Sequence, residues 1–322
     1  MHFFDAHCDI LSVINSPSQL VSNNRHWDIG RALSNGPFLQ VFSLFAPDSD
    51  PRSRKKKMED QLEMARLAES LFPERLKMVR TDGDIDNWIN DRDTRQVRYI
   101  IEAEGAEILG DSLDELDRLY DKGLRILTLS WNFDNSVCDS AAGVNTHNGL
   151  SAFGRKVIER AEKLGIIIDL SHSSDKTFSD VEEIAKKPFI ASHSNSRTVC
   201  GHRRNLADDQ VISVAKRGGV IGINLYPRFL ADTGNAGITE IIKHVEYISS
   251  LVGTGHIGFG FDFDGIDYTP DGIRGVEDTV KVAEALLRLN YSEEAVKGIA
   301  GLNFAGFMRR ILSGCEYSEN NI

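Results

Sequence analysis

The sequence has no long hydrophobic run, few cysteines and no excess of positive charge. No apolar stretch in its 322 residues approaches the roughly 20 residues that a membrane-spanning helix needs. The four cysteines are far apart and form no C-x-x-C pair, which argues against a cysteine metal site or a redox motif. We interpret them as free thiols in a reducing compartment: Cys8, Cys138, Cys200 and Cys315.

The balance of charge limits the partners that we expect. Lysine and arginine number 37 against 48 aspartates and glutamates, and the net charge of −11 repels phosphate backbones. A short basic stretch at 52–57 has the composition of a solvated helix start. The opening residues MHFFDAHCDI lack the basic and long apolar segments of a secretory signal. We expect a cytoplasmic protein that binds neither nucleic acid nor membranes.

What the chain does contain is an alternation of strands and helices. A hydrophobic fraction of 41% and a charged fraction of 26% are typical of a globular protein with a large core. Alternation predicts parallel pairing, and eight units close most economically into an α/β fold of the (β/α)8 TIM barrel type. An open doubly wound sheet with an accessory domain is the alternative. The expected strands are Phe3–Cys8, Phe38–Phe45, Val97–Glu102, Leu124–Leu129, Ile166–Leu170, Phe189–Ser192, Val220–Asn224 and His256–Phe261.

Amphipathic patterns between these strands predict helices. Ser112 with Glu115, and Ser179 with Glu182, have the spacing of capping boxes at helix starts. The expected helices cover 56–71, 113–122, 153–164, 181–186, 208–217 and 240–251.

We expect residues 1–322 to form a single catalytic barrel domain, because no linker, internal repeat or low-complexity tract marks a boundary. Three stretches depart from the simple pattern and are interpreted as loop insertions, at about 11–37, 72–94 and 132–150. The second contains a candidate extra strand at Leu76–Val79. The first and third follow strands, so we expect them to cover a site at the carboxyl ends of the barrel.

His7 and Asp9 stand at the end of the first expected strand. The two-residue period of a strand places both side chains on one face, which in a barrel is the interior. An imidazole and a carboxylate aimed together at the carboxyl-end mouth are suitable ligands for a divalent metal such as zinc. Without further support this short pattern is common by chance.

Three more candidate ligands follow other apolar strands. Glu104 comes at the exit of the third expected strand, where a carboxylate is costly to bury without a cation. His172 and His193 close the runs IIIDLSH and PFIASH, and a barrel brings such strand ends to one point. Five ligands exceed the usual protein complement of one zinc. We therefore favour two divalent ions that share the one carboxylate and hold a hydroxide between them.

Candidates for proton transfer and substrate binding follow two later strands. Asp262, in HIGFGFDFDG, is the expected general base, able to take a proton from the nucleophile and deliver it to a leaving amine. Asp264 shares its strand face and is the rival. We rank Asp262 first because it comes earlier in the strand. In the loop after His193, either Arg203 or Arg204 can hold a substrate carboxylate through its two-pronged guanidinium.

Taken together, these motifs resemble the renal or membrane dipeptidase family, zinc-dependent peptidases on an amidohydrolase-type barrel. The resemblance runs nearly end to end. It implies that His7, Asp9 and Glu104 bind one zinc, and that Glu104 bridges to a second zinc held by His172 and His193. The strings that carry it are DAHCDI, EAEGAE, GLRILTLSWN, GLSAFGRKVIERAEKLGIIIDLSH, PFIASHSNSRTVCGHRRNLADD and GFGFDFDG.

The resemblance also implies that Arg204 binds the C-terminal carboxylate of the substrate and that Asp262 is the catalytic acid/base. One departure concerns substrate binding. Where mammalian members have a histidine after the fourth strand, in a string like LTLTH, this chain reads LTLSW and places Trp131. Because tryptophan fills space and offers a single N–H donor, we expect Trp131 to alter the substrate range.

We therefore expect a two-zinc dipeptidase that cleaves small dipeptides, with a D-residue at the C-terminal position left open. The first alternative is another metal-dependent amidohydrolase that acts on N-acyl amino acids, cyclic amides or lactones. The second is a catalytically silent binding protein, against which the complete set of expected ligands argues. Barrels of this family often pair, so a homodimer is a further expectation.

Overall fold

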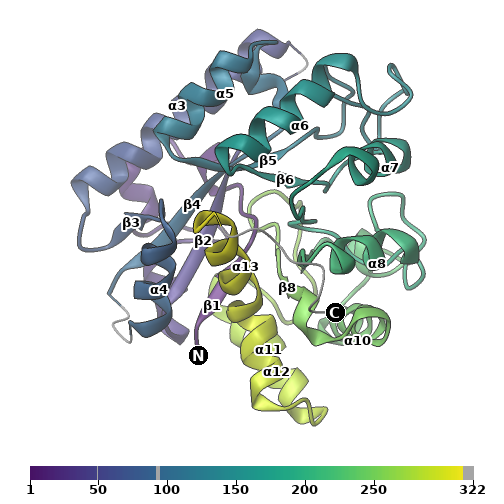
Figure 1. Ribbon diagram of the computed structural model, residues 1–322. Helices are drawn as coiled ribbons and strands as arrows, with labels where there is room; N and C mark the ends of the chain where they lie inside the picture. The colour runs from purple at the N-terminus through teal and green to yellow at the C-terminus, as the bar shows by residue number, and fades with distance from the viewer. Residues whose placement is uncertain (49, 92–94, 315–322) are drawn as a thin grey trace.

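A curled parallel sheet lies at the centre of the fold (Figure 1). The computed structural model describes residues 1–48, 50–91 and 95–314. Within these residues the strand order is β6-β5-β4-β2-β1-β8-β7, and β3 pairs with the first residues of β4. The strands are β1 (Phe3–Asp5), β2 (Phe38–Leu44), β3 (Leu76–Met78), β4 (Val97–Glu104), β5 (Leu124–Thr128), β6 (Ile167–Asp169), β7 (Ile221–Ile223) and β8 (Ile257–Phe259).

The expected strand Phe189–Ser192 is reduced to isolated bridges, but it still joins the two ends of the sheet. Ile190 pairs in parallel with Asp169 after β6, and Ala191 pairs in parallel with Ile221 of β7. Backbone hydrogen bonds run from Ile190 to both neighbours of Asp169, Ile168 and Leu170. With this segment between β6 and β7 the ring is complete, so the prediction of a (β/α)8 barrel is confirmed.

Helices cover the outside of the ring because their apolar stripes pack on its outward-facing residues. The longest, α3, begins with Pro51 after Asp50, whose carboxylate accepts from the backbone N–H groups of Arg52 and Ser53. None of the helices in the described part of the chain combines the length and apolarity that a membrane crossing requires. The helices are α1 (Ile10–Val13), α2 (Ile29–Ala32), α3 (Pro51–Leu71), α4 (Asp82–Asn90), α5 (Leu113–Lys122), α6 (Ala152–Leu164), α7 (Asp175–Ile184), α8 (Asp208–Lys216), α9 (Pro227–Leu230), α10 (Ile238–Val252), α11 (Thr279–Arg288), α12 (Glu293–Lys297) and α13 (Asn303–Leu312).

The last helix of the described residues, α13, closes the amino end of the ring. Figure 1 shows it lying across the centre of the strands. Its Phe304 and Phe307 belong to a buried cluster with residues from the inner face of most strands, among them Phe4 of β1 and Ile100 of β4. A Cβ added at Gly258 of β8 would collide with the Phe304 ring, so glycine there permits close packing. Within the described residues, α13 therefore fills the interior from the amino ends of the strands.

Two long connections within the barrel are also held by specific contacts. The backbone N–H groups of His26 and Trp27 donate to Asp264 at 2.9 and 3.2 Å, which fixes the segment at 11–37 to the residues after β8. The Trp27 ring is fully buried and packs edge-on against Phe42. The segment at 132–150 contains no helix or strand and folds around Asp134.

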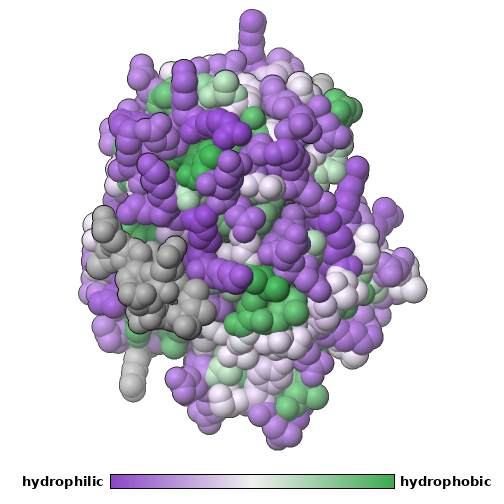
Figure 2. Space-filling model, turned by 45° about the vertical axis from the view of Figure 1, so that its right-hand side comes forward, coloured by the Kyte–Doolittle hydropathy of each residue, from purple (hydrophilic) through white to green (hydrophobic). Residues whose placement is uncertain are grey.

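On the face shown in Figure 2, hydrophilic residues dominate and hydrophobic ones form small separate patches.

Candidate metal centre

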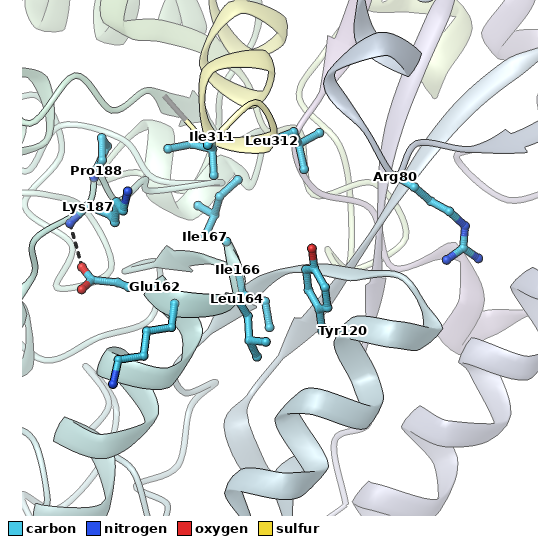
Figure 3. Close-up of a pocket in the computed structure, with 13 residues that line it drawn as sticks. Arg80, Tyr120, Glu162, Leu164, Ile166, Ile167, Lys187, Pro188, Ile311 and Leu312 are labelled. Atoms are coloured by element: carbon cyan, nitrogen blue, oxygen red, sulfur yellow. Dashed lines mark hydrogen bonds between the residues drawn. The ribbon is translucent and has the colours of Figure 1, made fainter. Parts of the chain in front are cut away.

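Two cavities differ in the chemistry of their walls. One of about 320 Å³ lies at the amino ends of the strands, where Ile311 and Leu312 of α13 face Ile167 (Figure 3). Among the described residues that line this cavity, Glu162 is the only one with a carboxylate, and it accepts a hydrogen bond from the backbone N–H of Lys187. No histidine or cysteine is among these residues. The other cavity, of about 270 Å³, lies at the carboxyl ends. Asp9, Glu104, His172 and Asp262 line it, and we take it as the candidate site.

The five expected metal ligands converge at this cavity, and all of them are buried. Glu104 lies at the centre of the group. Its Oε1 is 2.9 Å from Nε2 of His172, 3.5 Å from Nε2 of His193 and 3.8 Å from Nε2 of His7. The Nε2 of His7 is 3.3 Å from Oδ2 of Asp9. Side chains that are separated by up to 186 positions in the sequence therefore meet within a few ångströms.

The local backbone explains how these side chains reach the centre. Glu104 is the last residue of β4, whereas His7 and Asp9 follow β1, which ends at Asp5. His172 has φ of 66° and Asp262 has φ of 64°, both in the left-handed region. For residues other than glycine this conformation costs about 1–3 kcal/mol and is typical of functional sites. Both side chains line the cavity.

Each of the three imidazoles is held by its Nδ1 atom, and its Nε2 atom faces the centre. His7 Nδ1 lies 2.8 Å from Glu102 Oε2, and His193 Nδ1 lies 2.7 Å from Ser192 Oγ. His172 Nδ1 lies 3.1 Å from Asn132 Oδ1. Contacts of this kind fix the tautomer that presents Nε2 to a metal. None of these three supporting residues is predicted from the sequence. Only Glu102, two positions before Glu104 on the same strand, carried a signal in its spacing.

The electrostatics of the centre favour a cation. Burial alone lowers the pKa of His7, but Glu102, Asp9 and Glu104 outweigh it and raise that pKa well above its usual value. Burial raises the pKa of Glu104 well above its usual range, and Asp9 adds to the effect. Burial lowers the pKa values of His172 and His193, which keeps both imidazoles neutral. Neutral imidazoles and carboxylates that attract positive charge are the donors that a divalent metal needs.

Unpartnered polar atoms support the same conclusion. His7 Nε2 and Asp9 Oδ1 are buried and have no hydrogen-bond partner. Ligand atoms of His7, Glu104 and His193 lie within 4.8 Å of one another, as do those of His7, Asp9 and Asp262. Leaving such atoms unsatisfied is costly, and a bound cation would satisfy them. The residues present therefore fit a divalent metal.

Asp262 and Asp264 occupy different environments. Asp262 lines the cavity, and its Oδ1 is 3.9 Å from Nε2 of His7. Asn224 Nδ2 donates to its Oδ2 at 2.9 Å, and burial raises the pKa of Asp262 to about 7. Asp264 instead accepts backbone N–H groups of the segment at 11–37 and does not line the cavity. Of the two, only Asp262 faces the centre.

The two neighbouring arginines also separate. Arg204 is buried, its Nη2 donates to the backbone carbonyl of His193 at 3.4 Å, and its Nε has no partner. Its guanidinium lies 5.5 Å from the centre of the Phe229 ring, which lines the cavity. Burial lowers the pKa of Arg204 to about 10, so the group stays charged at neutral pH. Arg203 is exposed.

Trp131 lines the cavity together with Phe45. The two ring centres are 4.9 Å apart, and the Trp131 ring is 6.4 Å from the ring of His172. His147, on the same connection, is held by a contact of 2.7 Å between its Nε2 and the backbone carbonyl of Asn135. It does not line the cavity. The indole therefore forms one aromatic wall beside the expected metal ligands.

Comparison with known proteins identifies the fold and the family. A family model described as membrane dipeptidase (peptidase family M19) matches residues 1–319. An uncharacterized dipeptidase of Schizosaccharomyces pombe is 30% identical over 297 residues, which cover 86% of this chain and 70% of that protein. Dipeptidase 3 of Mus musculus is 29% identical over 278 residues, or 84% of this chain, which spans only 55% of the mouse protein.

Solved structures share the whole architecture. A metallopeptidase from Rhodobacter sphaeroides, crystallised with a phosphinate mimic of the dipeptide L-Ala-D-Ala, superposes with a TM-score of 0.87 at 24% identity. The match covers 97% of this chain and 99% of the other. At this level of identity the likeness establishes the fold.

Proposed function

The chain belongs to the membrane dipeptidase family, peptidase family M19, and from that premise we propose that it hydrolyses small dipeptides at the carboxyl-end cavity. The observation that carries the proposal is the convergence of five buried metal-binding side chains with Asp262 in that cavity. We also propose that the chain is one catalytic domain in which 11–37, 72–94 and 132–150 are insertions.

We propose zinc as the metal and two ions as the number. His7, Asp9 and Glu104 would hold one ion, and Glu104, His172 and His193 the other. The position of Glu104 Oε1, close to all three imidazoles, supports a shared carboxylate. When bound, such ions supply Lewis-acid polarisation of the amide carbonyl and lower the pKa of water.

Asp262 would move the proton. Its carboxylate accepts a proton from the attacking water and delivers it to the nitrogen of the leaving amine. A pKa of about 7 suits both halves of this exchange at neutral pH. Asn224 holds the other oxygen, so the free oxygen points to the centre.

Arg204 would select substrates that end in a free carboxylate. Its unpartnered Nε and its burial beside the site support this role, because a carboxylate can pair with the guanidinium in two-pronged fashion. The aromatic wall of Trp131 and Phe45 would receive a side chain of the dipeptide. A D-residue at the C-terminal position is part of the proposal, since the Rhodobacter relative binds a mimic of L-Ala-D-Ala.

A screen of the zinc-loaded protein against L,L-, L,D- and D,D-dipeptides tests the reaction. We expect hydrolysis in at least one class, and activity on none of them would overturn the proposal.

Trp131 favours a second candidate, a related amidohydrolase activity, because its bulk changes the cavity wall. N-acyl amino acids, cyclic amides and lactones therefore belong in the same screen. Replacement Trp131→His should shift the order of preferred substrates, and Trp131→Phe is the control because it keeps an aromatic ring at the same position of the wall.

A further inference from the structure

A continuous line of buried side chains connects two of the imidazoles beneath the metal centre. Every member is fully buried, so bulk water does not compete for its hydrogen bonds. The line consists of His7, Glu102, Thr128, Asp169, Ser192 and His193.

Thr128 is the middle of this line. Its Oγ1 lies 2.6 Å from Oε1 of Glu102 on one side and 2.6 Å from Oδ2 of Asp169 on the other. Thr128 is the last residue of β5, which pairs with β4 and with β6, so its side chain reaches carboxylates on both neighbouring strands. Among the described residues, no other hydroxyl contacts both carboxylates.

Each carboxylate supports one imidazole. Glu102 contacts Nδ1 of His7 through its other oxygen, at 2.8 Å. Asp169 Oδ2 accepts from Ser192 Oγ at 2.6 Å, and that hydroxyl lies 2.7 Å from Nδ1 of His193. A change in the position of the Thr128 hydroxyl therefore alters both supports at once.

We propose that Thr128 is a positioning residue that couples the orientation of His7, in one proposed ion site, to that of His193, in the other. The inference rests on the metal binding proposed above. It goes further because it makes the two proposed sites interdependent through a residue that belongs to neither proposed set of ligands. Occupation of one site then fixes the supporting carboxylates in the arrangement that the other site needs.

The comparison of Thr128→Val with Thr128→Ser tests the role of the hydroxyl. Valine keeps the shape and removes the hydroxyl, whereas serine keeps the hydroxyl. We expect the valine variant to bind zinc about 10–100-fold more weakly at both sites in chelator competition, and the serine variant to bind like the wild type. The absorption spectrum of the cobalt(II)-loaded protein should change for valine and be preserved for serine. A valine variant with wild-type affinity and spectrum would overturn the proposal.

A second measurement does not depend on folding of the valine variant. Glu102→Ala and Ser192→Ala each remove one support, at opposite ends of the line. If Thr128 couples them, the loss of zinc affinity in the double variant differs from the product of the single losses. Losses that simply multiply would contradict the coupling. Glu102→Ala combined with Asn132→Ala is the matched control, because Asn132 supports His172 outside the line, and there we expect multiplication.

Zinc binding is measured without substrate, so these outcomes separate from those of the dipeptide screen. A wild-type protein that binds two ions but hydrolyses no dipeptide would contradict the proposed reaction and leave the coupling measurable. A wild-type protein that binds no ion would overturn both.

Discussion

The Oε1 atom of Glu104 lies 2.9 Å from the Nε2 atom of His172. Burial lowers the pKa of His172 and keeps its imidazole neutral, and its Nδ1 proton is directed at Asn132 Oδ1, so the Nε2 atom is an acceptor. The same burial raises the pKa of Glu104, so its carboxylate also attracts positive charge, and a cation between the two atoms would satisfy both.

Metal removal should destabilise the protein and not merely inactivate it. A chelator leaves the carboxylates of Asp9, Glu104 and Asp262 without their counter-ion, and a ligand at 100 times its dissociation constant stabilises by about 2.7 kcal/mol. We expect a lower Tm in the chelated protein and recovery on addition of zinc. Glu104→Gln should reduce the bound zinc and abolish most of this recovery, whereas Glu162→Gln, at the other cavity, should preserve it. An unchanged Tm after chelation would count against a metal centre.

Replacement Asp262→Asn should reduce kcat with little effect on zinc content. Loss of a positioned acid/base group costs about 10²–10⁴-fold in rate. Asp264→Asn is the matched control, because Asp264 holds the backbone of His26 and Trp27. That variant should lose stability but keep a kcat close to wild type. Steady-state kinetics with metal analysis checks both, and equal kcat losses in the two variants would refute the assignment.

Arg204→Ala should raise KM for dipeptides much more than Arg203→Ala. Only Arg204 is buried beside the cavity, and a charge-assisted pair with a carboxylate is worth about 1.5–3 kcal/mol, or roughly 10–150-fold. Dipeptide amides, which lack the terminal carboxylate, should be poor substrates for the wild type. The Arg204 variant should cleave them only slightly less efficiently than the wild type does. If amides and free dipeptides are cleaved equally well by the wild type, this role is wrong.

His244 should make folding sensitive to acid. Burial lowers the pKa of His244 to about 4, although the Leu230 carbonyl, 3.1 Å from its Nε2, acts in the opposite direction. The backbone N–H of Ser196 donates to its Nδ1. The unfolded chain, with an ordinary pKa near 6.5, binds the proton more readily than the native state. Stability is therefore lost as the pH falls from about 6.5 to 4, by about 3 kcal/mol.

Denaturant unfolding at several pH values checks this effect. The stability advantage of the wild type over His244→Gln should shrink as the pH falls through that window. Comparison with the variant is needed because Asp5 and Asp264, whose pKa values are raised to about 6 by burial, contribute with the opposite sign. A constant difference between the two proteins from pH 7 to 4 would rule out the effect.

The barrel was predictable because its signals are local. Apolar runs bounded by polar residues placed β2 and β5 within one residue of their observed ends. Phe189–Ser192 was predicted as a full strand but forms only bridges, since pairing depends on neighbours that a single run does not reveal. Both capping boxes were wrong. Glu115 pairs with Arg118 and the Ser112 side chain makes no capping bond, while Ser179 lies inside α7.

The candidate site was predictable only in part. Residues such as His172 and Asp262 follow apolar strands, and the geometry of a barrel brings such positions together. Their supports come from elsewhere: Asn132 contacts His172, and Asn224 contacts Asp262, across 40 and 38 positions. Asparagine in a loop is common for many reasons, so these partners are visible only in three dimensions. Cys315 lies outside the described residues, whereas Cys8, Cys138 and Cys200 are free and buried.

The packing of α13 at the amino end of the ring would affect product release in the proposed reaction. Phe304 and Phe307 fill the amino end of the ring, so in the proposed reaction the substrate would enter and the products would leave at the carboxyl ends. Both amino acids released from a dipeptide would then share that exit. The C-terminal amino acid, bound through its carboxylate, would dissociate last. Its release would then limit the rate of turnover, and it would be the stronger product inhibitor of the two.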